Sequence, residues 1–169
     1  MSPGSRVQLE TQRMVGSPVR LEDLEDYDAL GSDPEVSRQN VGGPTSRKGI
    51  EQAIGHWKQH GIGFWTFRLK DNSFVGYIGT TYTHVVVPGH EKLQLRYAVV
   101  SRYRRKGYAS EMIEAAMNFV FNERGLHEVI GAAETDNLAS RRLMEKCGFQ
   151  HDAGLDIYRL QSPFSRERV

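Results

Sequence analysis

A run of basic residues between a strand pattern and a helix pattern is the feature that most constrains this chain. In the stretch KLQLRYAVV, residues 92–100, alternate side chains from Leu93 to Val99 are apolar or aromatic, which predicts a strand with one buried face. Residues 109–120 carry apolar side chains at helical spacing, and Gly125 suits the end of that helix. The segment between them contains four cations: Arg102, Arg104, Arg105 and Lys106.

These cations lie where a helix would repel them. The first turn of a helix carries about half a positive charge from its backbone dipoles, so acidic side chains are favoured there. A bound anion would remove the conflict, because free N–H groups, the dipole and the cations would all attract it. Gly107 has no side chain to keep a phosphate away from the backbone. We therefore expect an anion site here, with a solvated basic surface as the alternative.

The composition restricts the class of protein. The 169 residues, 38% hydrophobic and 25% charged, suit one globular domain with a core. The net charge of +1 disfavours a protein that coats nucleic acid. The single cysteine, Cys147, excludes an intrachain disulfide and a cysteine zinc cluster. No run of about 18 apolar residues and no secretory leader pattern occurs, so we expect a cytoplasmic protein without membrane association.

The remaining patterns predict one α/β domain with a mixed (α+β) sheet over residues 7–161, with flexible tails at 1–6 and 162–169. In the second half, the order strand, helix, strand, helix places residues 92–100 and 128–133 side by side as parallel strands. The first half predicts mainly antiparallel strands. The expected strands are 7–16, 63–69, 73–87, 92–100, 127–133 and a short hairpin within 149–160; the expected helices are 17–30, capped by Ser17 with Pro18 just inside, 47–60, 109–124 and 138–147, capped by Asp136 or Asn137.

Two common nucleotide-binding patterns do not occur at the basic segment or elsewhere in the sequence. A Walker loop needs G-x-x-x-x-G-K-[ST], whereas Lys106-Gly107 has the reverse order and lacks the upstream glycine. The stretch GIGFWT, residues 61–66, has only two glycines and opens no helix, so it is not a dinucleotide fingerprint. The anion must therefore be recognised by a different kind of loop.

The motif Arg104-x-x-Gly107-x-Ala109, between a strand and a helix, resembles the acyl-CoA pyrophosphate loop of the GNAT N-acyltransferase family. Its surroundings, YAVVSRYRRKGYASE, resemble the branch of that family that modifies ribosomal proteins and small amines. Three further stretches resemble the family in the expected order: LETQRM, FVGYIGTT and DNLASRRLMEKCGF. The resemblance covers residues 7–160 and implies an N-acetyltransferase that takes its acetyl group from acetyl-CoA.

The resemblance implies where acetyl-CoA would bind. The strand before the loop would splay from the next parallel strand, and the pantetheine arm would enter the gap. Backbone amides would hold the pyrophosphate, Arg104 and Lys106 would assist by charge, and Asn137 would contact the arm, cap the following helix, or do both. The implied cofactor-binding residues are Val99, Val100, Arg104, Arg105, Lys106, Gly107, Tyr108, Ala109, Ser110 and Asn137.

The resemblance also implies a reaction, direct attack of a substrate amine on the acetyl carbonyl. The family's commoner general acid is a tyrosine seven residues after the asparagine, and this position is Met144 here. Ser140 or water would then protonate the departing thiolate. Glu134 is the first candidate for the base, followed by Glu91 and Tyr82, although a solvated turn residue is the simpler interpretation of Glu134.

Several alternatives remain open on the sequence alone. A non-catalytic acyl-CoA-binding module of the same fold is one, because of Met144, and a nucleic-acid-binding protein that uses residues 102–106 is another. The sequence does not decide whether the acceptor is a peptide N-terminus or a small amine, nor whether the protein forms a homodimer. His56 and His60 have the spacing of two metal ligands but no third, so we expect surface histidines and no metal.

Overall fold

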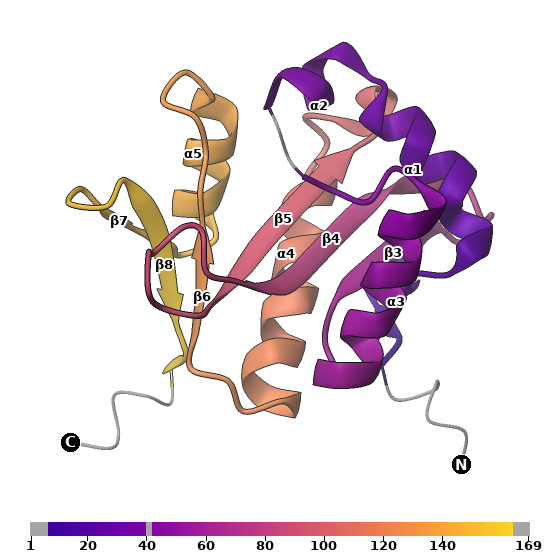
Figure 1. Ribbon diagram of the computed structural model, residues 1–169. Coiled ribbons are helices and arrows are strands. Elements are labelled where there is room, and N and C mark those ends of the chain that lie inside the picture. The colour runs from indigo at the N-terminus through magenta and orange to yellow at the C-terminus, as the bar shows by residue number, and fades with distance from the viewer. Residues whose placement is uncertain (1–6, 40–41, 164–169) are drawn as a thin grey trace.

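A computed structural model describes residues 7–39 and 42–163 of the chain (Figure 1). Within these residues the strands form one sheet in the order β1-β2-β3-β4-β5-β6-β8-β7. The strands are β1 (Leu9–Glu10), β2 (Met14–Pro18), β3 (Phe64–Leu69), β4 (Phe74–Thr83), β5 (Lys92–Val99), β6 (Glu128–Gly131), β7 (Gln150–Asp152) and β8 (Ile157–Gln161). The α-helices are α1 (Leu24–Gly31), α2 (Pro34–Gln39), α3 (Arg47–His60), α4 (Tyr108–Asn118) and α5 (Leu138–Lys146).

The sheet is mixed, as predicted. All neighbouring strands run antiparallel except β5 and β6, which are parallel and are joined through α4. The KDNS turn joins β3 to β4, and the final hairpin adds β8 to the outer edge of β6. The predicted α/β architecture with an antiparallel first half and one parallel pair is therefore confirmed.

Helices cover both faces of the sheet (Figure 1). On one face, α1 to α3 enclose a core that contains Tyr27, Ile50 and Tyr77. On the other face, α4 and α5 pack on β5 and its neighbours, and Met112 and Ile113 of α4 are fully buried there. Each such side chain contributes about 1.5–3 kcal/mol by leaving water. This packing holds the end of β5 and the start of α4 in fixed positions.

The N-terminal predictions need correction. Ser17 and Pro18 do not open a helix but end β2, where they lie opposite Thr66 and Trp65 of β3. A short 3₁₀ turn, Leu21–Asp23, precedes α1, and Asp23 accepts a hydrogen bond from the Arg20 N–H at 2.9 Å. The single strand expected over residues 7–16 is two strands, separated by a tight turn. A proline is tolerated in β2 because β1 is too short to pair with its end.

The tails expected from the sequence lie mostly outside the described residues, so they stay a prediction. Residues 1–6 and 164–169 lie outside the described residues. Ser162, which we assigned to the C-terminal tail, is buried, and its N–H donates to the carbonyl of His127 at 2.8 Å. None of the helices in the described ranges is long and apolar enough to cross a bilayer.

Candidate active site

The parallel pair of strands opens into a gap. β4 and β5 are in register over eight residue pairs, whereas β5 and β6 share a single registered pair, Gln94 with Ile130. Beyond this pair the two strands separate toward α2 and α5 (Figure 1). A cavity of about 450 Å³ lies at the separated end of β5, between the loop after β5 and α5. The splay that we expected from the sequence is thus present.

At the end of β5, Val99 and the next residue, Val100, direct their backbone groups to opposite edges of the strand. The Val100 N–H donates to the Val75 carbonyl of β4 at 2.8 Å, and the Val100 carbonyl accepts from Tyr103 N–H. Since N–H and C=O groups alternate between the two edges of a strand, those of Val99 point to the gap. Val99 therefore directs its backbone groups to the gap, whereas those of Val100 bond within the protein. That Val99 and Val100 face a ligand stays a prediction.

The basic segment forms a loop with two residues in the left-handed region. After the 3₁₀ turn Ser101–Tyr103, Arg105 has φ 61° and Gly107, at the N-cap of α4, has φ 82°. Such consecutive turns direct successive N–H groups into one concave surface, which suits an anion. The left-handed conformation costs an L-residue about 1–2 kcal/mol, so glycine is favoured at 107 and strain is held at Arg105.

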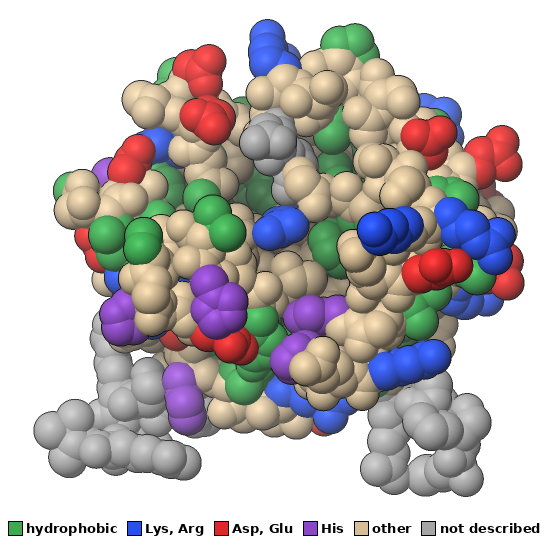
Figure 2. Space-filling model, in the orientation of Figure 1, with side chains coloured by type: hydrophobic (Ala, Val, Ile, Leu, Met, Phe, Trp, Pro, Cys, Tyr) green, Lys and Arg blue, Asp and Glu red, His purple; other side chains and the backbone are tan. Residues whose placement is uncertain are grey.

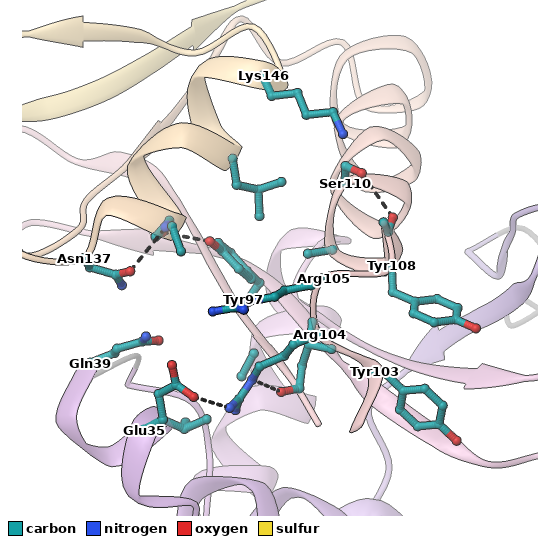
Figure 3. A pocket seen from close by; sticks show the side chains of 18 residues that line it. Glu35, Gln39, Tyr97, Tyr103, Arg104, Arg105, Tyr108, Ser110, Asn137 and Lys146 are labelled. Carbon is teal, nitrogen blue, oxygen red and sulfur yellow. Dashed lines mark hydrogen bonds and ion pairs between the residues drawn. The ribbon is translucent and has the colours of Figure 1, made fainter. Parts of the chain in front are cut away.

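Most of the predicted cofactor-binding residues border the cavity beside this loop (Figure 3). Arg105 comes from the loop, Asn137 and Lys146 from α5, and Glu35 and Gln39 from α2. Lys106 is exposed, and neither it nor Val100 lines the cavity. The predicted residues that do line it are Val99, Arg104, Arg105, Gly107, Tyr108, Ala109, Ser110 and Asn137.

Arg104 has protein partners rather than a free charge. Its Nε donates to the Val99 carbonyl at 3.0 Å, and its guanidinium forms ion pairs with Glu35 of α2 and, at 3.4 Å, with Asp33. We expected Arg104 to assist a pyrophosphate by charge. The two carboxylates instead balance that charge, and Arg104 ties α2 to the end of β5. The basic cluster is therefore less basic than its sequence suggests.

An arginine for which the sequence predicts no role packs against the loop. Arg13, in the turn between β1 and β2, donates to the Lys106 carbonyl at 2.9 Å and forms an ion pair with Glu111 of α4. Its guanidinium lies 3.9 Å from the centre of the Tyr108 ring. Burial alone raises the pKa of Glu111, but hydrogen bonds from Thr11 and Arg13 outweigh it and the pKa is lowered. The partners are nearly a hundred positions apart, so only the fold brings them together.

A tyrosine and a serine meet at the inner end of the cavity. The Tyr97 hydroxyl of β5 donates to Ser140 Oγ of α5 at 2.7 Å, and Asn137 caps α5 by accepting from the Ser140 N–H at 3.2 Å. Burial raises the pKa of Tyr97, which the hydrogen bond to Ser140 opposes only in part. The phenol therefore stays protonated at neutral pH. The sequence assigned Tyr97 only to the apolar face of a strand.

A second, smaller cavity of about 230 Å³ opens beside the first. The two cavities share Gln39, Tyr97, Asn137 and Ser140. Glu134, exposed after β6, borders the smaller one, whereas Glu91 and Tyr82 border neither. Met144 is 2% exposed. Its sulfur packs so closely on Gly131 that a Cβ added to Gly131 would lie 2.5 Å from that sulfur. Met144 thus has a packing role.

His56, one of the two histidines at metal-ligand spacing, is held by hydrogen bonds to the backbone. His56 Nε2 accepts from the Tyr82 N–H at 3.2 Å, so Nδ1 carries the proton and donates to the Ile62 carbonyl at 2.8 Å. Burial lowers the pKa of His56. Among the residues that the structure describes, no group of three or more His, Cys, Asp or Glu side chains is arranged to hold a metal ion.

Charge on the visible surface is mixed. Figure 2 shows Lys and Arg side chains interspersed with Asp and Glu, and histidines gathered over the lower part of this face. Together with the carboxylates that neutralise Arg104, this distribution offers little support for the nucleic-acid alternative.

Comparison with known proteins identifies the class of this fold and site. The model of the acetyltransferase (GNAT) domain matches residues 13–150. The uncharacterized N-acetyltransferase YoaA of Bacillus subtilis (strain 168) is 31% identical over 162 residues, which cover 91% of this chain and 89% of that protein. The chain belongs to the GNAT acetyltransferase family, and it is an acetyl-CoA-dependent acetyltransferase.

Solved structures share the fold. A putative ribosomal-protein-serine acetyltransferase from Vibrio cholerae superposes with a TM-score of 0.71 at 19% identity, over 91% of this chain and 97% of that one. The spermidine N-acetyltransferase of Vibrio cholerae, solved with CoA and spermine, superposes with a TM-score of 0.72 at 15% identity, over 89% of this chain and 96% of that one. The resemblance seen in the sequence motifs is confirmed at the level of fold and family.

Proposed function

We propose that the protein acetylates a primary amine, a small amine or a peptide N-terminus, by direct attack of the amine on acetyl-CoA while both are bound. One observation carries this proposal: the two cavities meet at the Tyr97–Ser140 pair. A thioester reaching the end of the larger cavity and an amine in the smaller one would come together at this pair. The spermidine N-acetyltransferase of similar fold supports an amine acceptor here.

The larger cavity suits acetyl-CoA. Its loop offers the amides that follow Arg105 and the N-terminus of α4, where a pyrophosphate is favoured. Arg105 and Lys146 add positive charge on two of its walls, and the arm would run along the exposed edge of β5 toward Tyr97. Asn137 keeps its capping bond to Ser140, so its amide nitrogen remains directed outward for a second contact.

The reaction needs little from the protein beyond placement and two hydrogen bonds. A C–N bond forms as the nitrogen attacks the acetyl carbon, the C–S bond breaks, the nitrogen loses one proton and the sulfur gains one. The Val99 N–H faces the gap and would stabilise the oxyanion. Ser140 would donate to the departing sulfur, with Tyr97 fixing the direction of the serine proton. Glu134 or water would accept the proton that the ammonium loses before the attack, and the proton that the nitrogen loses on attack would replace the one that Ser140 gives to sulfur.

Steady-state kinetics test this mechanism. Release of the CoA thiol would be followed while acetyl-CoA and an amine are varied together. Direct attack in a ternary complex predicts intersecting double-reciprocal plots, and parallel plots, the signature of an acetyl-enzyme intermediate, would contradict it.

A further inference from the structure

The smaller cavity contains a cation whose direct partners are uncharged. Arg96 of β5 is half-buried, and its two terminal nitrogens donate to the Gly42 carbonyl at 3.0 Å and to Gln94 Oε1 at 3.3 Å. No Asp or Glu in the described ranges forms an ion pair with it. Burial lowers the pKa of Arg96, which nearby Tyr77 opposes, but a guanidinium remains charged at neutral pH.

Two other half-buried arginines differ from Arg96: Arg104, which lines the larger cavity, and Arg141, whose partner Asp156 lines the smaller one. Arg104 has two carboxylate partners, and Arg141 pairs with Asp156 at 3.1 Å. A charge withdrawn from water without an opposite charge is costly, and a bound anion offsets that cost. Arg96 therefore offers a place for an anionic group of a ligand.

The opposite wall of the smaller cavity carries an available negative charge. Asp156 is already engaged by Arg141 and by His151, at 2.7 Å. Glu134 lines the same cavity, is exposed and forms no ion pair with another described residue. The cavity thus presents a cation from β5 and an anion from the segment after β6, with Ser140 at its junction with the larger cavity.

The size of the cavity favours a small ligand. Its volume of about 230 Å³ is below the roughly 300–1,000 Å³ of pockets that hold drug-sized molecules. Its lining is rich in polar groups, among them Gln39, Gln94 and Thr135. A compact zwitterion fits these features better than a long chain does.

We propose that the acceptor is a small amine that also carries a carboxylate, of the free amino acid class, and that Arg96 binds the carboxylate. The inference rests on the acetyltransferase function proposed above. With its carboxylate on Arg96, such an acceptor directs its amine toward Glu134 and Ser140. A polyamine brings only positive charge to Arg96, and the residue at a peptide N-terminus has a neutral carbonyl in place of the carboxylate.

The test compares acceptors that differ only in this group. Thiol release from acetyl-CoA would be measured with each of the twenty L-amino acids, with the corresponding amino acid amides, and with spermidine and a short peptide. The expected result is a kcat/KM for at least one amino acid about tenfold or more above that for its amide, the discrimination expected for a charge-assisted pair.

Variants separate binding of the carboxylate from a structural role. Arg96→Gln keeps a donor for the Gly42 carbonyl but loses the charge, and we expect it to abolish the preference for acid over amide while leaving the KM for acetyl-CoA unchanged. Arg96→Lys should retain part of the preference. The control is Arg124→Gln, since exposed Arg124 also donates to a glycine carbonyl, that of Gly61, but borders neither cavity.

The outcomes are distinguishable. If amides, spermidine or the peptide are acetylated as well as the amino acids, or if Arg96→Gln keeps the preference, the inference is overturned and the acetyltransferase function stands. If acetyl-CoA binds but no amine releases thiol, the proposed function fails and the inference fails with it.

Discussion

The Tyr97 hydroxyl and Ser140 Oγ lie 2.7 Å apart and form a hydrogen bond across the gap between β5 and α5. Both residues border both cavities, so this bond marks the place where donor and acceptor would meet. Tyr97 also places a phenol beside Ser140. The position where the family commonly has a tyrosine acid is Met144 in this chain. The phenol comes from the sheet instead of the helix.

Removing either hydroxyl should slow the chemical step. We expect Ser140→Ala to lower kcat by about 10²-fold, the lower end of a typical proton-transfer contribution, and Tyr97→Phe to lower it less, because Tyr97 acts through Ser140. The KM for acetyl-CoA should change little. The double variant should be no slower than Ser140→Ala, since the two groups act as one unit. Additive losses in kcat would show that they act separately.

Replacing Gly107, whose backbone is in the left-handed region, should lower the free energy of unfolding. Gly107→Ala places a Cβ at φ 82° and 3.3 Å from Arg13, so we expect a loss of about 1–2 kcal/mol in the free energy of unfolding. Gly55→Ala is the matched control, because Gly55 lies within α3 and a Cβ there meets nothing within 4 Å. It should gain about 0.5–1 kcal/mol. Urea unfolding of both variants measures the difference, and equal effects would contradict this account of the loop.

Acid should destabilise the protein through His56. Its folded-state pKa is lowered by burial from an unfolded value of about 6.5, so the unfolded chain binds the proton more readily. The stabilising contribution is present above pH 6.5 and is lost as the pH falls from there through the folded-state pKa. Urea unfolding between pH 7.5 and 5 should show a steeper loss of stability in the wild type than in His56→Asn. Exposed His90, replaced by Asn, serves as the control and should keep the wild-type slope.

Local patterns in the sequence predicted much of the fold. The strand at 92–100, the helix after Gly107 and the Asn137 cap are each specified within short stretches, by alternation, helical spacing or a capping side chain. The parallel pair follows from the order of these elements. The prediction that Ser17 and Pro18 open a helix was wrong because residues distant in sequence decide their structure. The same residues suit a helix start in isolation, and pairing with β3 overrides that preference.

The candidate site was predictable where it is continuous in sequence and not where distant segments meet. The loop from Arg104 to Ser110 has a recognisable motif and borders the cavity. The partners of Arg104 lie about seventy residues upstream, and Tyr97 and Ser140 are forty-three apart. The charge of Arg96 is informative only because the fold places it in a cavity without a carboxylate partner among the described residues. None of these relationships has a local signature.

Calorimetric titration of acetyl-CoA tests the central claim most directly, that the loop around Gly107 holds the acyl donor. The wild type should bind acetyl-CoA saturably. Gly107→Glu, which puts a negative side chain where the pyrophosphate would lie, should lose binding, while Gly55→Glu, the same change on an exposed helix, should bind as the wild type does. The opposite result, no binding by the folded wild type or unchanged binding by Gly107→Glu, would contradict the account.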